Sequence, residues 1–263
     1  MGKLNYTLSG EAGASAVLFL HGFMGSAEDW RGTMAALDER YLCLAVDLPG
    51  HGGSVGLPRE DYTFEGAALR VLDLLDELDI ERPTIVGYSM GGRLALYLAL
   101  RYPERCAGLF LESASPGIEG AAERRARREA DEERARSLEE DDLQDFLVDW
   151  YGQPLFASLA RREGLVHKTI EARLRNRPEE LAVSLRGMGA GNQPSLWGEL
   201  EGLAVPKIAV AGALDGKFAG ISRRMQTASP HVRAAVVPGA GHNVRLEAPE
   251  VYLKLLQDLF QAI

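Results

Sequence analysis

The sequence predicts an α/β protein built on a mostly parallel, doubly wound sheet, with a helical cap inserted into it. Short apolar runs that end in glycine or polar residues alternate with stretches whose apolar residues recur every three or four positions. These patterns are typical of buried parallel strands and of helices that pack on them. Residues 117–204 break the alternation with a charge-dense stretch and then further helical pattern. We therefore expect a cap over a core made of residues 1–116 and 205–263.

Six apolar runs are predicted as strands, at residues 16–22, 41–47, 83–89, 106–113, 206–212 and 233–239. Residues 64–78 carry an apolar stripe at helical spacing, and residues 93–104 are apolar nearly all round, so both segments are predicted as helices. Pro249 suits the first turn of a helix and opens the predicted last helix. Because strands alternate with helices, we expect the strands to run parallel.

The charge and composition of the 263-residue chain argue against several classes of protein. A formal net charge of −9 disfavours nucleic-acid binding, which needs a clustered basic surface, but allows a local arginine cluster that binds a small anion. No apolar run approaches the roughly 20 residues that span a bilayer, and the first residues include no apolar leader segment. The two cysteines stand in apolar settings, and no metal-ligand spacing occurs. We expect a cytoplasmic protein without membrane association, metal or cofactor.

The segment GYSMG, residues 87–91, has the pattern Gly-x-Ser-x-Gly between a predicted strand and a predicted helix. There the pattern predicts a nucleophile elbow, a sharp turn that lifts the Ser89 hydroxyl clear of the sheet. A serine hydroxyl needs a histidine to take its proton and an acid to orient that histidine. His242, on a glycine-rich loop before the last helix, and Asp215, just past a predicted strand, complete the order of such a triad. Glu112 is the alternative acid, although its position also suits capping of the next turn.

The segment LHGFMGS, residues 20–26, follows a predicted strand and supplies candidate donors for a developing oxyanion. We expect the backbone N–H groups of Phe23 and Met90 to form this oxyanion hole. The alternative for Gly22 and Gly25 is a plain turn. The other histidines are assigned to orientation of the oxyanion loop (His21), to a turn after a strand (His51) and to the surface (His167 and His231).

Several longer segments carry a resemblance to one family: LHGFMGSAEDW, VDLPGHGGS, VGYSMGGR, DWYGQPLFASL, SLRGMGAGNQPSLW, GALDGKF and GAGHNVRLEAPE. They resemble the 2-succinyl-6-hydroxy-2,4-cyclohexadiene-1-carboxylate synthases of menaquinone biosynthesis, which have the α/β-hydrolase fold. The segments run from Leu20 to Glu250, so the resemblance covers nearly the whole chain. DWYGQPLFASL and SLRGMGAGNQPSLW, both in the predicted cap, are far more particular to this family than the motifs around the triad.

The resemblance implies a lyase that eliminates pyruvate from 2-succinyl-5-enolpyruvyl-6-hydroxy-3-cyclohexene-1-carboxylate. The Ser89–His242 pair would take the proton next to the succinyl ketone, and the oxyanion donors would hold the enolate oxygen. One alternative is a carboxylic-ester or thioester hydrolase that uses the same triad. The other is a non-catalytic binding protein of the same fold, which we would expect to lack a triad residue.

The implied substrate carries three carboxylates, so the site needs about as many cations, preferably arginines. By resemblance these are Arg93, Arg124 and Arg173, while Tyr88 and Trp150 line the pocket. Arg93 has the alternative of a surface position, and Trp150 that of packing between cap and core. Arg175 and Arg177 are close rivals of Arg173. Other arginines of the charge-dense stretch compete with Arg124, and we expect most of them to lie on solvated helix faces: Arg125, Arg127, Arg128, Arg134 and Arg136.

Overall fold

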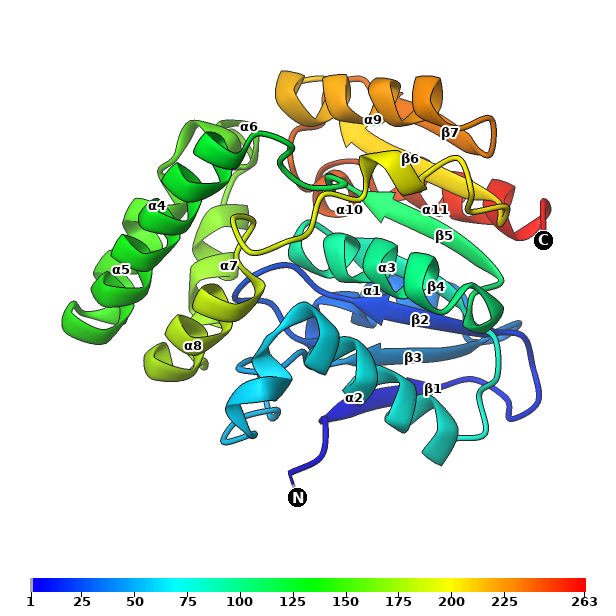
Figure 1. Ribbon diagram of the computed structural model, residues 1–263, viewed down its shortest axis with the longest axis horizontal. Coiled ribbons are helices and arrows are strands. Elements are labelled where there is room, and N and C mark those ends of the chain that lie inside the picture. The colour runs from blue at the N-terminus through cyan, green and yellow to red at the C-terminus, as the bar shows by residue number, and fades with distance from the viewer. Residues whose placement is uncertain (1) are drawn as a thin grey trace.

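The computed structural model describes residues 2–263 and has at its centre a seven-stranded sheet in the order β1-β3-β2-β4-β5-β6-β7 (Figure 1). The strands are β1 (Tyr6–Ser9), β2 (Ala16–Leu20), β3 (Leu42–Val46), β4 (Thr84–Tyr88), β5 (Gly108–Glu112), β6 (Lys207–Gly212) and β7 (Val232–Val237). Neighbouring strands run parallel except for β1, which pairs antiparallel with β3. The loops after β2, β4, β5 and β6 therefore leave the sheet at the same edge.

Helices cover both faces of the sheet because the central strands are apolar on both sides. One face is covered by α2 (Phe64–Glu77), α3 (Met90–Arg101) and α9 (Gly216–Ala228), and the other by α1 (Arg31–Ala35) and α11 (Pro249–Phe260). Leu18 of β2 shares a buried cluster with Leu94 of α3. Phe19, the next residue, points the other way and lies 5.1 Å from Trp30 between ring centroids.

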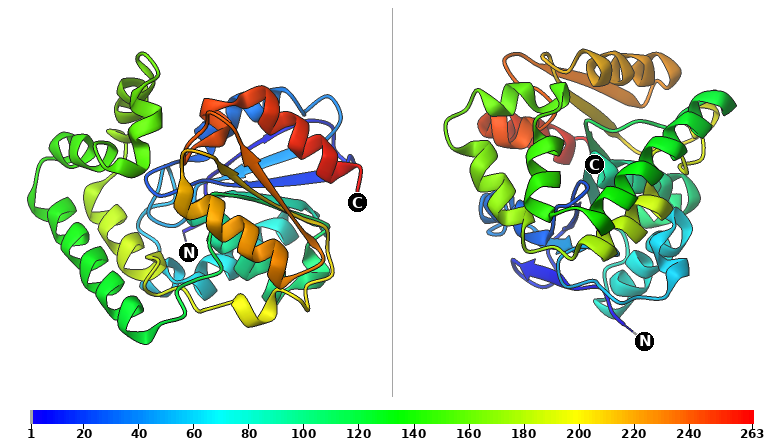
Figure 2. Two further views of the ribbon diagram at one scale, coloured as in Figure 1. Left: turned by 90° about the horizontal axis from the view of Figure 1, so that it is seen from above. Right: turned by 90° about the vertical axis from the view of Figure 1, so that its left-hand side faces the viewer.

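A third layer of helices lies between β5 and β6 in the sequence and over the carboxyl ends of the strands (Figures 1 and 2). It consists of α4 (Ala121–Glu140), α5 (Leu143–Tyr151), α6 (Ala157–Ala160), α7 (Leu165–Arg173) and α8 (Pro178–Met188). These helices have a core of their own, in which Leu138, Leu147 and Leu181 are buried. Met24, from the loop after β2, is buried in the same core, so this loop joins the helical layer to the sheet.

The predicted fold class is confirmed, and a strand occupies each of the six predicted runs with its ends shifted by at most two residues. The sequence does not predict β1, because this edge strand has only four residues and exposes Tyr6 and Leu8 instead of burying an apolar run. Both cysteines are free and buried, as expected. Among residues 2–263, no helix is long and apolar enough to cross a membrane.

Candidate active site

Ser89 lies in a strained turn between β4 and α3. Its backbone has φ 50° and ψ −106°, a region that residues with a side chain rarely adopt. Its N–H donates to the carbonyl of Glu112 at 2.8 Å, which ties the turn to β5. A Cβ at Gly91 would lie 2.2 Å from the carbonyl oxygen of Leu20, and a Cβ at Gly87 only 2.5 Å from that of Gly91. Only glycine fits at these two positions, so the turn has the geometry of a nucleophile elbow.

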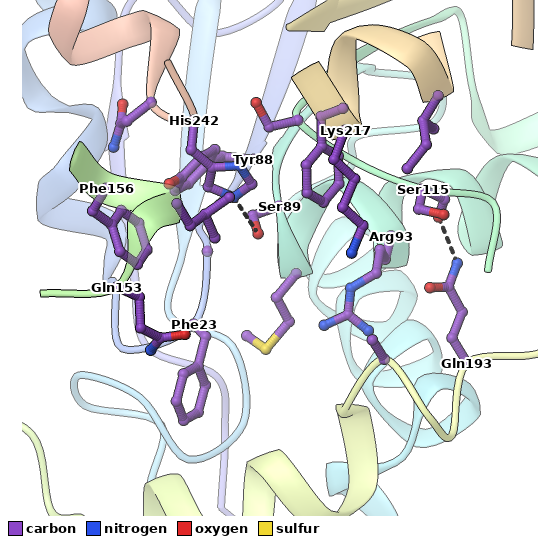
Figure 3. A pocket seen from close by; sticks show the side chains of 18 of the residues that line it. Phe23, Tyr88, Ser89, Arg93, Ser115, Gln153, Phe156, Gln193, Lys217 and His242 are labelled. Atoms are coloured by element: carbon purple, nitrogen blue, oxygen red, sulfur yellow. Dashed lines mark hydrogen bonds between the residues drawn. The ribbon is translucent and has the colours of Figure 1, made fainter. Parts of the chain in front are cut away.

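The side chains of Ser89, His242 and Asp215 form a hydrogen-bonded row, part of which is drawn in Figure 3. Nε2 of His242 lies 3.2 Å from the Ser89 hydroxyl oxygen, and Nδ1 lies 2.7 Å from Oδ2 of Asp215. Because the carboxylate accepts the Nδ1 proton, Nε2 is free to accept the proton of the serine. The other oxygen of Asp215 accepts the N–H of Phe218 at the start of α9, which fixes the carboxylate in place.

Glu112 does not occupy the position of the acid. Its side chain is fully buried at the end of β5, and Oε1 accepts the N–H of Arg245 in α10 (Val244–Glu247) at 2.9 Å. It therefore contacts the segment after His242 and does not cap the turn that follows its own strand. Burial raises the pKa of Glu112 to about 7, because a charged carboxylate loses hydration there.

The loop after β2 places the backbone of Phe23 opposite the first turn of α3. Within residues 2–263, the N–H groups of Phe23 and Met90 have no hydrogen-bond partner, and both residues line the cavity beside Ser89. His21 holds this loop. Its Nε2 accepts the N–H of Leu48 at 2.9 Å, so Nδ1 carries the proton and donates to the carbonyl of Gly22 at 2.7 Å. The geometry fits the predicted oxyanion hole.

The remaining histidines lie where the sequence places them. His51 is in a turn after β3 and its Nδ1 lies 3.1 Å from the Pro49 carbonyl oxygen. The side chain of His167 is exposed and pairs with Glu171 on the same helix, and His231 is also exposed. None of these three residues lines the cavity.

The triad opens into a cavity of about 380 Å³ between the sheet and the helical layer. Figure 3 shows a largely aromatic side, with Phe23, Tyr88 and Phe156, and a polar side, with Arg93, Gln193 and Lys217. Trp150 also lines the cavity, and its ring lies 5.4 Å from that of Phe23. Trp150 therefore both lines the pocket and packs between the helical layer and the sheet. The cavity suits a ligand that is apolar on one side and anionic on the other.

Arg93 projects from the first turn of α3 into the cavity (Figure 3). One guanidinium nitrogen donates to the carbonyl of Met188 at 2.9 Å, and the group lies 5.5 Å from the ring centre of Phe64. No carboxylate of the described chain pairs with it. Burial lowers the pKa of Arg93 to about 9, so it is charged at neutral pH. A half-buried cation without an acidic partner favours an anionic ligand.

Arg173 also lines the cavity, but its charge is compensated within the protein. It donates to both carboxylate oxygens of Asp29, each at 2.7 Å, and to the hydroxyl of Tyr151 at 3.3 Å. Only 6% of the residue is exposed. Neighbouring negative charge and hydrogen bonds raise the pKa of Arg173 against the opposing effect of burial. Two guanidinium N–H groups are left over for a ligand, since three of the five are in use.

The long helix α4 turns a different set of arginines toward the cavity than the sequence predicts. Arg124 does not line the cavity, whereas Arg127 and Arg134 do. Arg127 and Arg134 are seven residues apart and share a helix face with Glu123, which also lines the cavity, whereas Arg124 is one position further round the helix. Arg127 and Arg134 share the buried carboxylate of Asp131, at 2.8 and 3.4 Å. Arg136, in contrast, is exposed and pairs with a glutamate on the surface.

The sequence reasoning missed Lys217, which points into the cavity from the first turn of α9 (Figure 3). No carboxylate of residues 2–263 pairs with Lys217, and the N-terminal end of a helix disfavours a positive charge. The segment GALDGKF carried the signal, because a lysine two residues after Asp215 must lie near the triad. Arg224 lines the cavity as well, but it is paired with Glu119 at 2.7 Å.

A serine–histidine–aspartate triad on a mostly parallel sheet defines the α/β-hydrolase class. Residues 15–249 match the family described as alpha/beta hydrolase fold. The chain is 35% identical over 252 residues to the 2-succinyl-6-hydroxy-2,4-cyclohexadiene-1-carboxylate synthase of Serratia proteamaculans, covering 95% of this chain and 94% of the relative. Identity to the synthase of Klebsiella pneumoniae (strain 342) is 34% over 253 residues, with 95% and 96% covered. This chain belongs to that synthase family within the α/β-hydrolase fold.

Solved structures agree with this assignment. The structure of MenH from S. aureus has a TM-score of 0.92 to this chain, with 29% identity and coverage of 99% of this chain and 98% of that one. The enol-lactonase from Burkholderia xenovorans LB400 has a TM-score of 0.84 at 22% identity, with 98% and 96% covered. The second likeness shows the fold alone, because the identity is low.

Proposed function

We propose that the cavity catalyses the synthase reaction through Ser89, His242 and Asp215, with the N–H groups of Phe23 and Met90 as the oxyanion hole. The chain is a 2-succinyl-6-hydroxy-2,4-cyclohexadiene-1-carboxylate synthase, a carbon–oxygen lyase of menaquinone biosynthesis. One observation carries the catalytic proposal: a complete triad opens into a cavity whose lining includes positive charges without an acidic partner.

The reaction is an elimination in which no acyl-serine forms. Ser89 Oγ takes the proton from ring carbon 2 while His242 Nε2 takes the hydroxyl proton. The electron pair of the broken C–H bond moves onto the succinyl ketone oxygen, where the two N–H groups stabilise the charge. When this electron pair moves back from the ketone oxygen, a double bond forms between carbons 2 and 3 and the existing double bond shifts to carbons 4 and 5. The bond from carbon 5 to the enolpyruvyl oxygen then breaks. The leaving group takes up a proton and departs as pyruvate.

The cations that line the cavity fit a substrate with three carboxylates. Arg93 and Lys217 have no acidic partner in the described chain, so an anion bound there gains most from them. Arg127, Arg134 and Arg173 are anchored by Asp131 and Asp29 and can present their remaining N–H groups. We propose that these five residues bind the carboxylates of the substrate, and we call them the carboxylate grip. Arg124 is not part of it. Tyr88 and Trp150 form the apolar wall.

We also propose that residues 1–116 and 205–263 form the catalytic core and that residues 117–204 form a cap over it. The cap would supply Trp150 and three cations of the grip, and the core would supply the triad. Since both cysteines are free, we propose the reducing cytoplasm as the location.

The test is the reaction of the purified chain with 2-succinyl-5-enolpyruvyl-6-hydroxy-3-cyclohexene-1-carboxylate, followed by release of pyruvate. A parallel assay uses p-nitrophenyl acetate and butyrate, which lack the carboxylates of the substrate. We expect rapid pyruvate release and slow ester hydrolysis. Ester hydrolysis that outpaces pyruvate release at equal enzyme would assign the triad to a hydrolase.

A further inference from the structure

Glu247, at the end of α10, is a buried carboxylate that the proposed mechanism does not use. It is 3% exposed, and no lysine, arginine or histidine of residues 2–263 pairs with it. A buried carboxylate is costly unless its oxygens accept hydrogen bonds. Oε2 accepts the N–H of Gly241 at 3.0 Å, and Oε1 accepts the hydroxyl of Ser158 at 3.1 Å. Both oxygens thus have partners, in two different parts of the fold.

The two partners connect the helical layer to the catalytic histidine. Ser158 lies in α6, between β5 and β6, and Gly241 directly precedes His242. A Cβ on Gly241 would lie 1.9 Å from the Ser158 hydroxyl oxygen, so only glycine lets α6 come this close. Phe156, two residues before Ser158, packs edge-on against His242 with ring centroids 5.9 Å apart.

The position of His242 is sensitive to this contact. Its Nε2 is 3.2 Å from the serine oxygen, near the upper limit of a good hydrogen bond, so a small shift of the loop weakens proton transfer. After His242, the loop is held by the bond from the Arg245 N–H to Glu112. Before it, the N–H of Gly241 is held by Glu247.

We propose that Glu247 is a positioning residue that couples α6 to His242. Through its two hydrogen bonds, the carboxylate holds the histidine loop in its catalytic place when α6 packs against the loop, and Ser158 acts through Glu247. This inference rests on the proposed function of the triad.

The test compares Glu247→Ala, Glu247→Gln, Ser158→Ala and the double variant Glu247→Ala/Ser158→Ala. Glutamine retains an acceptor for Gly241 and a donor for the serine oxygen, so we expect it to keep kcat within about threefold. Glu247→Ala should lower kcat about 10- to 100-fold with little change in KM, because a misplaced base slows chemistry more than binding. Ser158→Ala should lower kcat by a smaller factor, and the double variant should be no slower than Glu247→Ala. Glu250→Ala, an exposed glutamate in the next helix, is the matched control and should behave as wild type.

A second measurement separates this proposal from the synthase assignment. The rate at which phenylmethanesulfonyl fluoride labels Ser89 depends on the base and not on the natural substrate, and it should fall in parallel with kcat. If wild type releases no pyruvate, the proposed function fails, while the labelling rates still report on Glu247. The coupling would be overturned if Ser89 of Glu247→Ala is labelled at the wild-type rate. It would also be overturned if the effects of Ser158→Ala and Glu247→Ala on kcat multiply in the double variant. Ser158 is only half-buried, so the Ser158→Ala variant still tests the coupling even if Glu247→Ala fails to fold.

Discussion

The carboxylate of Asp215 lies 2.7 Å from Nδ1 of His242, and the two residues are only 7% and 3% exposed. Shielded from water, this pair fixes the imidazole tautomer and leaves Nε2 to face Ser89. The bond is the part of the site in which a change of one atom should have the largest effect on turnover.

Asp215→Asn should lower kcat by about 10⁴-fold, because an amide that donates to Nδ1 forces the wrong tautomer on His242. Ser89→Ala should lower kcat by a similar factor. Pyruvate release measures the rate, and circular dichroism checks that each variant is folded. Turnover near that of wild type in either folded variant would contradict the assigned triad.

Arg93→Ala should lower kcat/KM by about 10- to 200-fold, since a charge-assisted contact contributes roughly 1.5–3 kcal/mol. Arg93→Lys should recover only part of this loss, because an ammonium group cannot form the two-pronged contact. Arg136→Ala is the control, since that side chain is exposed and outside the cavity. Equal kinetics of Arg93→Ala and wild type would remove Arg93 from the grip.

Arg134→Ala should lower kcat/KM. Arg124→Ala, on the same helix, should keep kcat/KM within about twofold of the wild-type value, as is usual for a residue that contacts no ligand. The reason is the register of α4, which turns Arg134 to the cavity and Arg124 away from it. Steady-state kinetics of the two variants test this directly. The reverse ranking would show that substrate binding rotates or shifts α4.

Lys217→Met should raise KM about 5- to 20-fold and change kcat little, since one partly solvated contact to a carboxylate is lost. The effect should shrink as salt is added, because salt screens an exposed charge. A series of KM measurements in sodium chloride tests both points. A KM that is unchanged at low salt would place Lys217 outside the binding site.

Glu112 should make stability depend on pH. Its pKa rises from the ordinary 4.5 to about 7 on folding, so the folded state favours the neutral form. The stabilisation that this shift gives the folded state is therefore fully present below pH 4.5. As the pH rises to 7, the free energy of unfolding falls by up to about 3 kcal/mol. Urea unfolding of wild type and Glu112→Gln between pH 5 and 8 should show Glu112→Gln gaining relative stability with rising pH. Parallel curves would mean that Glu112 titrates alike in both states.

The order of strands and helices, the elbow and the triad could be read from the sequence because each depends on local chemistry. A glycine two positions on either side of Ser89 is needed wherever that turn is made, and His242 and Asp215 follow strand ends whose place in a parallel sheet is fixed. Edge strand β1 could not be read in this way, since it buries no apolar run.

Which cations line the cavity was decided only by the tertiary structure. Arg124, Arg127 and Arg134 lie in one charge-dense helix, and their sequence neighbours look alike. Their roles differ because the packing of α4 against α8 sets the rotation of the helix, and that rotation depends on contacts between distant segments. The same holds for the pairing of Arg173 with Asp29, 144 residues apart, and for the link from Ser158 to Glu247 across 89 residues. The sequence by itself determined the fold and the three residues of the proposed triad, because local turn chemistry and strand order specify them, whereas long-range packing alone decided which charges remain uncompensated.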